Sequence, residues 1–82
     1  MIEDRIRAYI VRTAGLASAP ADRDRLVDRG FVPSVRLLDL VGFLEEEFAI
    51  RLRAIDVVPE KLATISQISD VVRARLTPAQ PR

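Results

Sequence analysis

Apolar residues recur at helical spacing in three segments of this chain. The clearest segment covers residues 34–49, where apolar positions follow in steps of four, three and four: Leu37, Val41, Leu44 and Phe48. Such steps place the side chains on one face of an α-helix. Residues 2–16 and residues 64–76 show related spacing. The pattern therefore predicts an all-α protein with three main helices.

Residues that commonly begin or end helices bound these segments. Gly15 stands near the end of the first segment. Pro33 directly precedes the second, and a proline suits the first turn because its missing N–H is not needed there. Thr64 and Gln67 have the spacing of a capping box at the start of the third segment.

Two connections join the predicted helices. Residues 17–33 form a long first loop, and the residues expected to pin it to the core are Leu26, Val27, Phe31 and Val32. The second connection, residues 50–63, is expected to hold one short turn around Pro59. The whole chain, residues 1–82, is expected to be a single domain: a four-helix bundle with three main helices and one short one. Pro78 and Pro81 are expected to separate the last helix from a polar tail over residues 77–82.

The composition narrows the chemistry that the chain can perform. It contains no Cys, which excludes disulfides and Cys-based zinc or iron–sulfur sites. It contains no His, which excludes a Ser–His–Asp hydrolase and removes the commonest transition-metal ligand. We therefore expect a protein that is not an enzyme and has no metal site.

Charge and hydropathy predict where the protein resides and which partners it lacks. The chain has 13 basic and 12 acidic residues, a net charge of +1, whereas nucleic-acid-binding domains show a strongly basic face. No apolar run approaches the ~20 residues of a membrane span. The start of the chain, Met1 to Asp4, does not resemble the basic start of a secretory signal. The expectation is a soluble, cytoplasmic protein without nucleic-acid or membrane partners.

Ser34 is the candidate site residue because of its position. It lies at the predicted start of the 34–49 helix, beside the long loop. Free N–H groups and the helix dipole favour an anion at a helix start, so a phosphodiester on Ser34 would be stabilised there. The alternative is a serine that only caps the helix, which is the commonest role for serine at such a position.

Other reactive side chains give weaker signals. Lys61 follows Glu60 in a stretch that is expected to be exposed, where a solvated lysine is the expected role. Residues 45–47 are all Glu, but consecutive helical residues point about 100° apart. Their carboxylates are therefore expected to diverge rather than to form one acid–base or metal site.

The predicted 34–49 helix also carries apolar residues away from its core stripe. Val35 and Leu38 fall on a second side, which Gly42 continues, and the acids that flank this side are Asp39, Glu45 and Glu46. An apolar strip with acids beside it suits a protein partner with a basic rim, because charge steers the encounter and apolar contact holds it. The alternative is that this side is buried against the other helices.

Two sequence runs resemble the acyl carrier proteins. Residues 30–50 read GFVPSVRLLDLVGFLEEEFAI, and residues 56–65 read DVVPEKLATI. Members of that family typically read Gly-x-x-Asp-Ser-Leu, then an apolar helix that ends Leu-Glu-Glu-Glu-Phe-x-Ile, then a Thr-Ile or Thr-Val helix start. The offset of ten residues from Leu44 aligns Ser34 with the family's modified serine. The similarity covers about residues 26–76.

The resemblance implies an acyl-carrier-like four-helix bundle and a specific role for Ser34. That serine would carry 4′-phosphopantetheine through a phosphodiester, installed from coenzyme A by a phosphopantetheinyl transferase. The cofactor's thiol would hold an acyl or aminoacyl group as a thioester. An acyl- or aminoacyl-loading ligase and downstream acyl-transfer enzymes of fatty-acid or polyketide type biosynthesis would be further partners. The residues that would face the partners are Val35, Leu38, Asp39, Glu45 and Glu46.

The chain departs from the family pattern in two ways. Pro33 stands where the family has an Asp that caps the helix and helps the transferase recognise the serine. The net charge of +1, with Arg36 two positions after Ser34, differs from the strongly acidic family members. Both departures point to a specialised carrier with its own enzymes. The alternatives are an unmodified, degenerate carrier-like interaction module and a small helical nucleic-acid binder.

Overall fold

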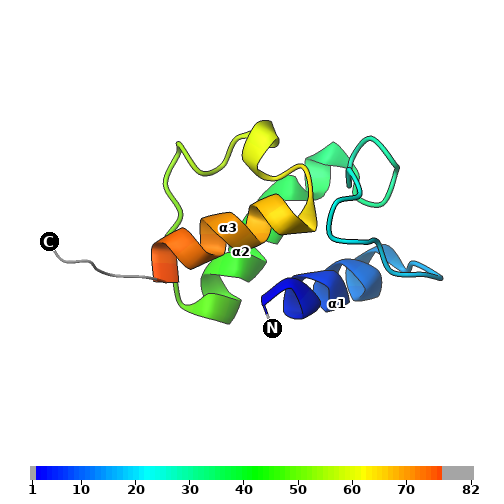
Figure 1. Ribbon diagram of the computed structural model, residues 1–82, viewed down its shortest axis with the longest axis horizontal. Coiled ribbons are helices and arrows are strands. Elements are labelled where there is room, and N and C mark those ends of the chain that lie inside the picture. Colours follow the sequence, from blue (N-terminus) through cyan, green and yellow to red (C-terminus); the bar gives the residue numbers. More distant parts are fainter. Residues whose placement is uncertain (1, 77–82) are drawn as a thin grey trace, which may run out of the picture.

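The computed structural model describes residues 2–76, which form three α-helices and two short 3₁₀ turns (Figure 1). The α-helices are α1 (Ile2–Ala14), α2 (Leu37–Phe48) and α3 (Ile65–Leu76). Helix α3 packs against both α1 and α2. No strand occurs among residues 2–76, so the described part of the chain is all-α, as predicted. The predicted tail and the two prolines at positions 78 and 81 lie outside the described residues.

Helix α1 ends at Ala14, directly before Gly15, as the sequence predicts. The predicted segment, residues 2–16, is two residues longer than the helix. Gly15 has a φ of +63°, in the left-handed region that a side chain with a Cβ disfavours. The N–H of Leu16 donates to the carbonyl of Val11 at 3.2 Å, the bond that closes a Schellman-type helix end. Ile6 and Ile10 form the buried face of this helix.

The predicted 34–49 helix begins differently from the expectation. Residues Ser34–Arg36 form a 3₁₀ turn, η1, and the α-helix starts only at Leu37. Pro33 is extended, with a φ of −63° and a ψ of 143°, and neither it nor Arg36 provides a side-chain cap. Without a cap, the first turn closes with the tighter bonds that are common at helix ends. Ser34 is therefore the first residue of a 3₁₀ turn that leads directly into α2, and the α-helix itself begins one turn later.

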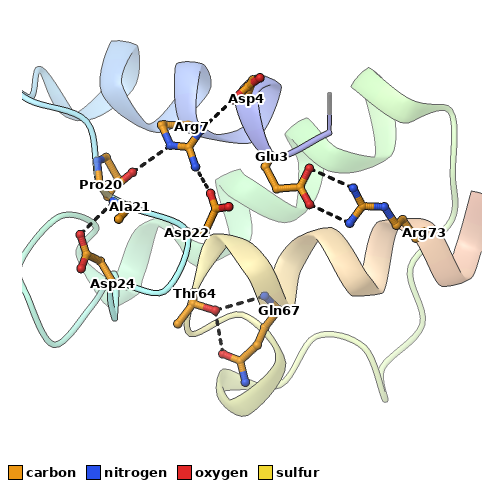
Figure 2. Close-up of polar contacts among 10 residues, drawn as sticks. All are labelled: Glu3, Asp4, Arg7, Pro20, Ala21, Asp22, Asp24, Thr64, Gln67 and Arg73. Carbon is orange, nitrogen blue, oxygen red and sulfur yellow. Dashed lines mark hydrogen bonds and ion pairs between the residues drawn. The ribbon is translucent and has the colours of Figure 1, made fainter.

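The start of α3 matches its predicted cap. The N–H of Gln67 donates to Thr64 Oγ1 at 3.1 Å, and the Thr64 hydroxyl donates to Gln67 Oε1 at 3.2 Å (Figure 2). The turn predicted around Pro59 is η2 (Pro59–Lys61), a single 3₁₀ turn. The described chain therefore has three α-helices, and the short fourth helix of the prediction is reduced to this turn.

One core joins the three helices and the long first loop. The buried apolar residues that form it are Ile6, Ile10, Leu26, Val32, Leu40, Leu44, Phe48, Leu62, Ile65, Ile68 and Val72. Two of these, Leu44 and Phe48, belong to the predicted stripe of α2, whose other members, Leu37 and Val41, are half-buried. Leu40, which the stripe did not include, is buried as well. The register predicted for α2 is thus correct for Leu44 and Phe48.

The long first loop is held to the bundle at Leu26. This side chain is fully buried, and its N–H donates to the carbonyl of Ala63 at 2.8 Å. Its carbonyl accepts the N–H groups of Phe31 and Val32, which folds the end of the loop back on itself. Val32 is buried and Phe31 half-buried, as expected for pinning residues. Val27 is 37% exposed, so its predicted role in the core is wrong.

Arg7 of α1 ties the first half of the same loop. Its guanidinium donates to the carbonyl of Pro20 at 2.8 Å and also pairs with Asp4 and Asp22 (Figure 2). The carbonyl of Asp22 in turn accepts the N–H of Ser66 on α3 at 2.9 Å. The loop is therefore an ordered bridge between α1 and α3, and it positions the residues that precede Ser34.

Candidate functional site

Ser34 is exposed at the first position of η1. Its hydroxyl makes no hydrogen bond to any residue in the described range 2–76, so the capping role considered for it is absent there. The position of Ser34 at a predicted helix start favours a capping role, which the structure does not show. The extended Pro33 instead leaves the Ser34 hydroxyl available to solvent or to an enzyme.

A small pocket of about 170 Å³ opens beside Ser34. Its walls come from the long first loop, the start of α2 and the connection before α3, with Val27, Leu37 and Leu62 among the apolar lining residues. Arg25 also lines this pocket and is paired with Asp28 at 2.6 Å. Ser34 thus borders an apolar recess with an arginine at its edge.

The two apolar residues proposed for partner binding are exposed, Val35 on η1 and Leu38 on α2. Val35 is 81% exposed and Leu38 is 74% exposed, whereas Leu40 and Leu44 of α2 are buried in the core. Burial of Val35 and Leu38 against the other helices, the alternative raised by the sequence, is wrong. Gly42 is exposed on the same helix, and a Cβ added there would meet no atom within 4 Å. The result is an open apolar surface directly after Ser34.

The acidic residues proposed to flank this surface divide into two groups. Asp39 and Glu46 are exposed and make no ion pair within the described residues. Glu45 is half-buried, and its carboxylate accepts the N–H of Leu52 at 2.9 Å. Glu47 pairs with Arg5 of α1. The three consecutive glutamates therefore diverge, as predicted, and Glu45 holds the connection that follows α2.

Sequence reasoning missed a larger pocket on the other side of Ser34. It has a volume of about 280 Å³ and lies between α1, the end of the long loop and the start of α2. Pro33 and Arg36, which flank Ser34 in sequence, both line it, as does Asp39. No motif signalled this pocket, because its walls come from three segments that only the fold brings together.

Two carboxylates with lowered pKa values, Glu3 and Asp56, form ion pairs with arginines of α3. A side-chain hydrogen bond from Arg73 lowers the pKa of Glu3, and one from Arg75 lowers the pKa of Asp56. The Glu3–Arg73 pair, with contacts of 2.8 and 2.9 Å, joins α1 to α3 (Figure 2). Both displaced carboxylates are therefore structural ion-pair partners.

Residues 2–76 include no group of three or more Asp or Glu residues arranged to hold a metal ion. None of the helices in this range is both long enough and apolar enough to span a bilayer.

The features that distinguish the region around Ser34 are an exposed hydroxyl, an exposed apolar surface and two flanking pockets. No family model matches the chain, and searches among curated proteins and solved structures found no match.

Proposed function

We propose that this protein is an acyl-carrier-type protein in which Ser34 bears 4′-phosphopantetheine. The group would hold an acyl or aminoacyl cargo as a thioester, and the protein would present that cargo to partner enzymes without itself being a catalyst. The observation that carries the proposal is the state of Ser34. Its hydroxyl is exposed, makes no hydrogen bond to the described residues and is followed directly by the exposed Val35.

The residues around Ser34 are compatible with a phosphodiester that bears a long arm with two amide groups and a terminal thiol. The only atom that must react is the Ser34 oxygen, which would displace 3′,5′-adenosine diphosphate from coenzyme A and retain the phosphopantetheine. Arg36 lines one of the two pockets beside this serine and supplies a positive charge, whereas Arg25, which lines the other pocket, is paired with Asp28. The chain has no Cys, so the cofactor would supply the thiol on which the cargo is held.

The exposed side of η1 and α2 would be the docking surface for partners. Val35 and Leu38 would supply the apolar contact, and Asp39 and Glu46 the acidic rim. Glu45 contributes less to this rim than the sequence predicts, because one of its oxygens is bound to the N–H of Leu52. Arg36 adds a positive charge to the same side, so the partner surface is expected to carry at least one acid.

The intact mass of the protein after incubation with coenzyme A and a broad-specificity phosphopantetheinyl transferase tests the proposal. We expect the wild type to gain the mass of one phosphopantetheine and Ser34→Ala to gain nothing. Ser18→Ala removes another exposed serine and is the matched control, because it is expected to be modified like the wild type.

Pro33→Asp decides the case in which the wild type is not modified. If this variant gains phosphopantetheine, the scaffold is that of a carrier and Pro33 restricts which transferase can act on it. If neither protein is modified at any transferase concentration, the unmodified interaction module becomes the better explanation. Pro33 is the observation that favours that second function, because it supplies no cap and no carboxylate beside the serine.

A further inference from the structure

The pocket of about 280 Å³ has apolar walls and a charged mouth. Its apolar lining includes Tyr9 and Ile10 of α1, Phe31 and Val32 of the long loop, and Leu40 of α2. Ile10, Val32 and Leu40 are core residues, so the pocket reaches the edge of the hydrophobic core. Phe43 stacks on the ring of Tyr9 with the ring centroids 4.0 Å apart, which holds one wall in place.

Arg36 and Asp39 carry opposite charges at the opening of this pocket, and neither is in an ion pair with another described residue. Arg36 and Asp39 both line the pocket and are exposed. Neither forms an ion pair within residues 2–76, although most of the arginines in the first half of the chain are paired. Arg12 also lies nearby, with its guanidinium 5.8 Å from the centroid of the Tyr9 ring. A ligand that satisfies Arg36 and Asp39 must carry both a negative and a positive group.

We propose that this pocket binds a free α-amino acid with an apolar side chain. The side chain would enter the apolar recess, the carboxylate would pair with Arg36 and the ammonium group with Asp39. Arg36 and Asp39 are three positions apart on one helical run, which places them on the same side of it. The volume is about twice that of a 150 Å³ cavity that accommodates benzene, so a leucine or phenylalanine side chain fits. Binding is non-covalent and independent of the modification proposed for Ser34.

Backbone amide chemical shifts of the ¹⁵N-labelled protein during titration test this inference. The probes are L-phenylalanine, 3-phenylpropionate, which lacks the ammonium group, and phenethylamine, which lacks the carboxylate. We expect saturable shifts with phenylalanine at Thr13, Phe31, Arg36 and Asp39. Each exposed ion pair contributes about 1.4- to fivefold in affinity, so the other two probes are expected to bind about 1.4- to fivefold more weakly. Absence of saturable shifts, or equal affinity for 3-phenylpropionate, would overturn the proposal.

Two rim variants separate the charges from the apolar recess. Arg36→Gln and Asp39→Asn are each expected to weaken phenylalanine binding and to abolish the preference over the probe that lacks the corresponding charge. Arg51→Gln and Glu60→Gln are matched controls at exposed positions away from this pocket, and they are expected to bind like the wild type. If all four variants bind phenylalanine with equal affinity, the assignment of Arg36 and Asp39 to the ligand's two charges is wrong. Ser34→Ala is expected to bind phenylalanine with wild-type affinity. The titration therefore tests the pocket whether or not Ser34 carries phosphopantetheine.

Discussion

Asp56 and Arg75 form a two-point ion pair that holds the second connection against α3. Arg75 Nε donates to Asp56 Oδ2 at 2.8 Å, and Nη2 donates to Oδ1 at 2.9 Å. Asp56 is only 4% exposed and also accepts the N–H of Arg53 at 2.9 Å. A buried carboxylate with three charge-assisted or backbone donors stabilises the fold only while it is ionised.

The stability contributed by Asp56 is therefore expected to depend on pH. The hydrogen bond from Arg75 lowers the pKa of Asp56 in the folded protein. Its contribution is complete above the unfolded-state pKa of about 3.9 and is lost as the pH falls through the lower folded-state value. Asp56→Asn should lower the free energy of unfolding by about 1.5–3 kcal/mol at pH 7. Urea unfolding at pH 7, 5 and 3 checks this, and a difference from wild type that is as large at pH 3 as at pH 7 would contradict it.

Leu44 and Leu38 provide a paired test of the α2 register. Leu44 is fully buried, and Leu44→Ala should lower the free energy of unfolding by about 2–5 kcal/mol, through lost burial and the cavity left behind. Leu38 is 74% exposed, and Leu38→Ala should change it by less than about 0.5 kcal/mol. Thermal melting followed by circular dichroism measures both. Equal losses in the two variants would show that the helix is rotated from the orientation described here.

Ser69 is a buried residue whose hydroxyl has no hydrogen-bond partner among residues 2–76. An unsatisfied buried hydroxyl costs free energy, and Ala is also the better helix former. Ser69→Ala should therefore raise the free energy of unfolding by about 1 kcal/mol, which corresponds to roughly 4–8 °C in Tm for a domain of this size. Differential scanning calorimetry checks the shift. A lower Tm would mean that the hydroxyl has a partner, such as a bound water.

Two glycines are expected to respond in opposite directions to the same substitution. Gly42 is helical and exposed, with nothing within 4 Å of an added Cβ, so Gly42→Ala should stabilise by about 0.5–1 kcal/mol. Gly15 has a φ of +63° at the end of α1, so Gly15→Ala should destabilise by about 1–2 kcal/mol. Urea unfolding of both variants measures the two signs. A loss of stability in Gly42→Ala would refute the exposed position of that residue.

Predictions from the sequence were correct where the responsible interactions are local. The end of α1 at Gly15 and the cap of α3 at Thr64 depend on residues at most five positions apart. The core face of α2 follows from the helical period alone, and it also explains why Leu38 points away from the core. Leu26 and Val27 show the opposite case. They are adjacent in an irregular loop, where no period distinguishes the buried residue from the exposed one.

Turn η1 shows how the start of an α-helix predicted from a local pattern can still be wrong by one turn. The apolar period gives the helix axis and face, but it does not distinguish α-helical from 3₁₀ hydrogen bonding. That choice depends on which groups satisfy the free N–H groups of the turn, and no side chain does so at Pro33 or Arg36. The position of Ser34 at a predicted helix start therefore did not decide between a hydroxyl that caps the helix and the exposed hydroxyl that the structure has.

The sequence by itself determined the three helices and their buried faces, because periodicity and capping act over a few residues. Only the tertiary structure decided how distant segments meet. It drew Glu45 to the N–H of Leu52, paired Asp56 with Arg75 across 19 positions, and enclosed the pocket beside Arg36 and Asp39. The physical reason is that such contacts depend on how the helices pack and where the long loop is held, which no short stretch of sequence specifies.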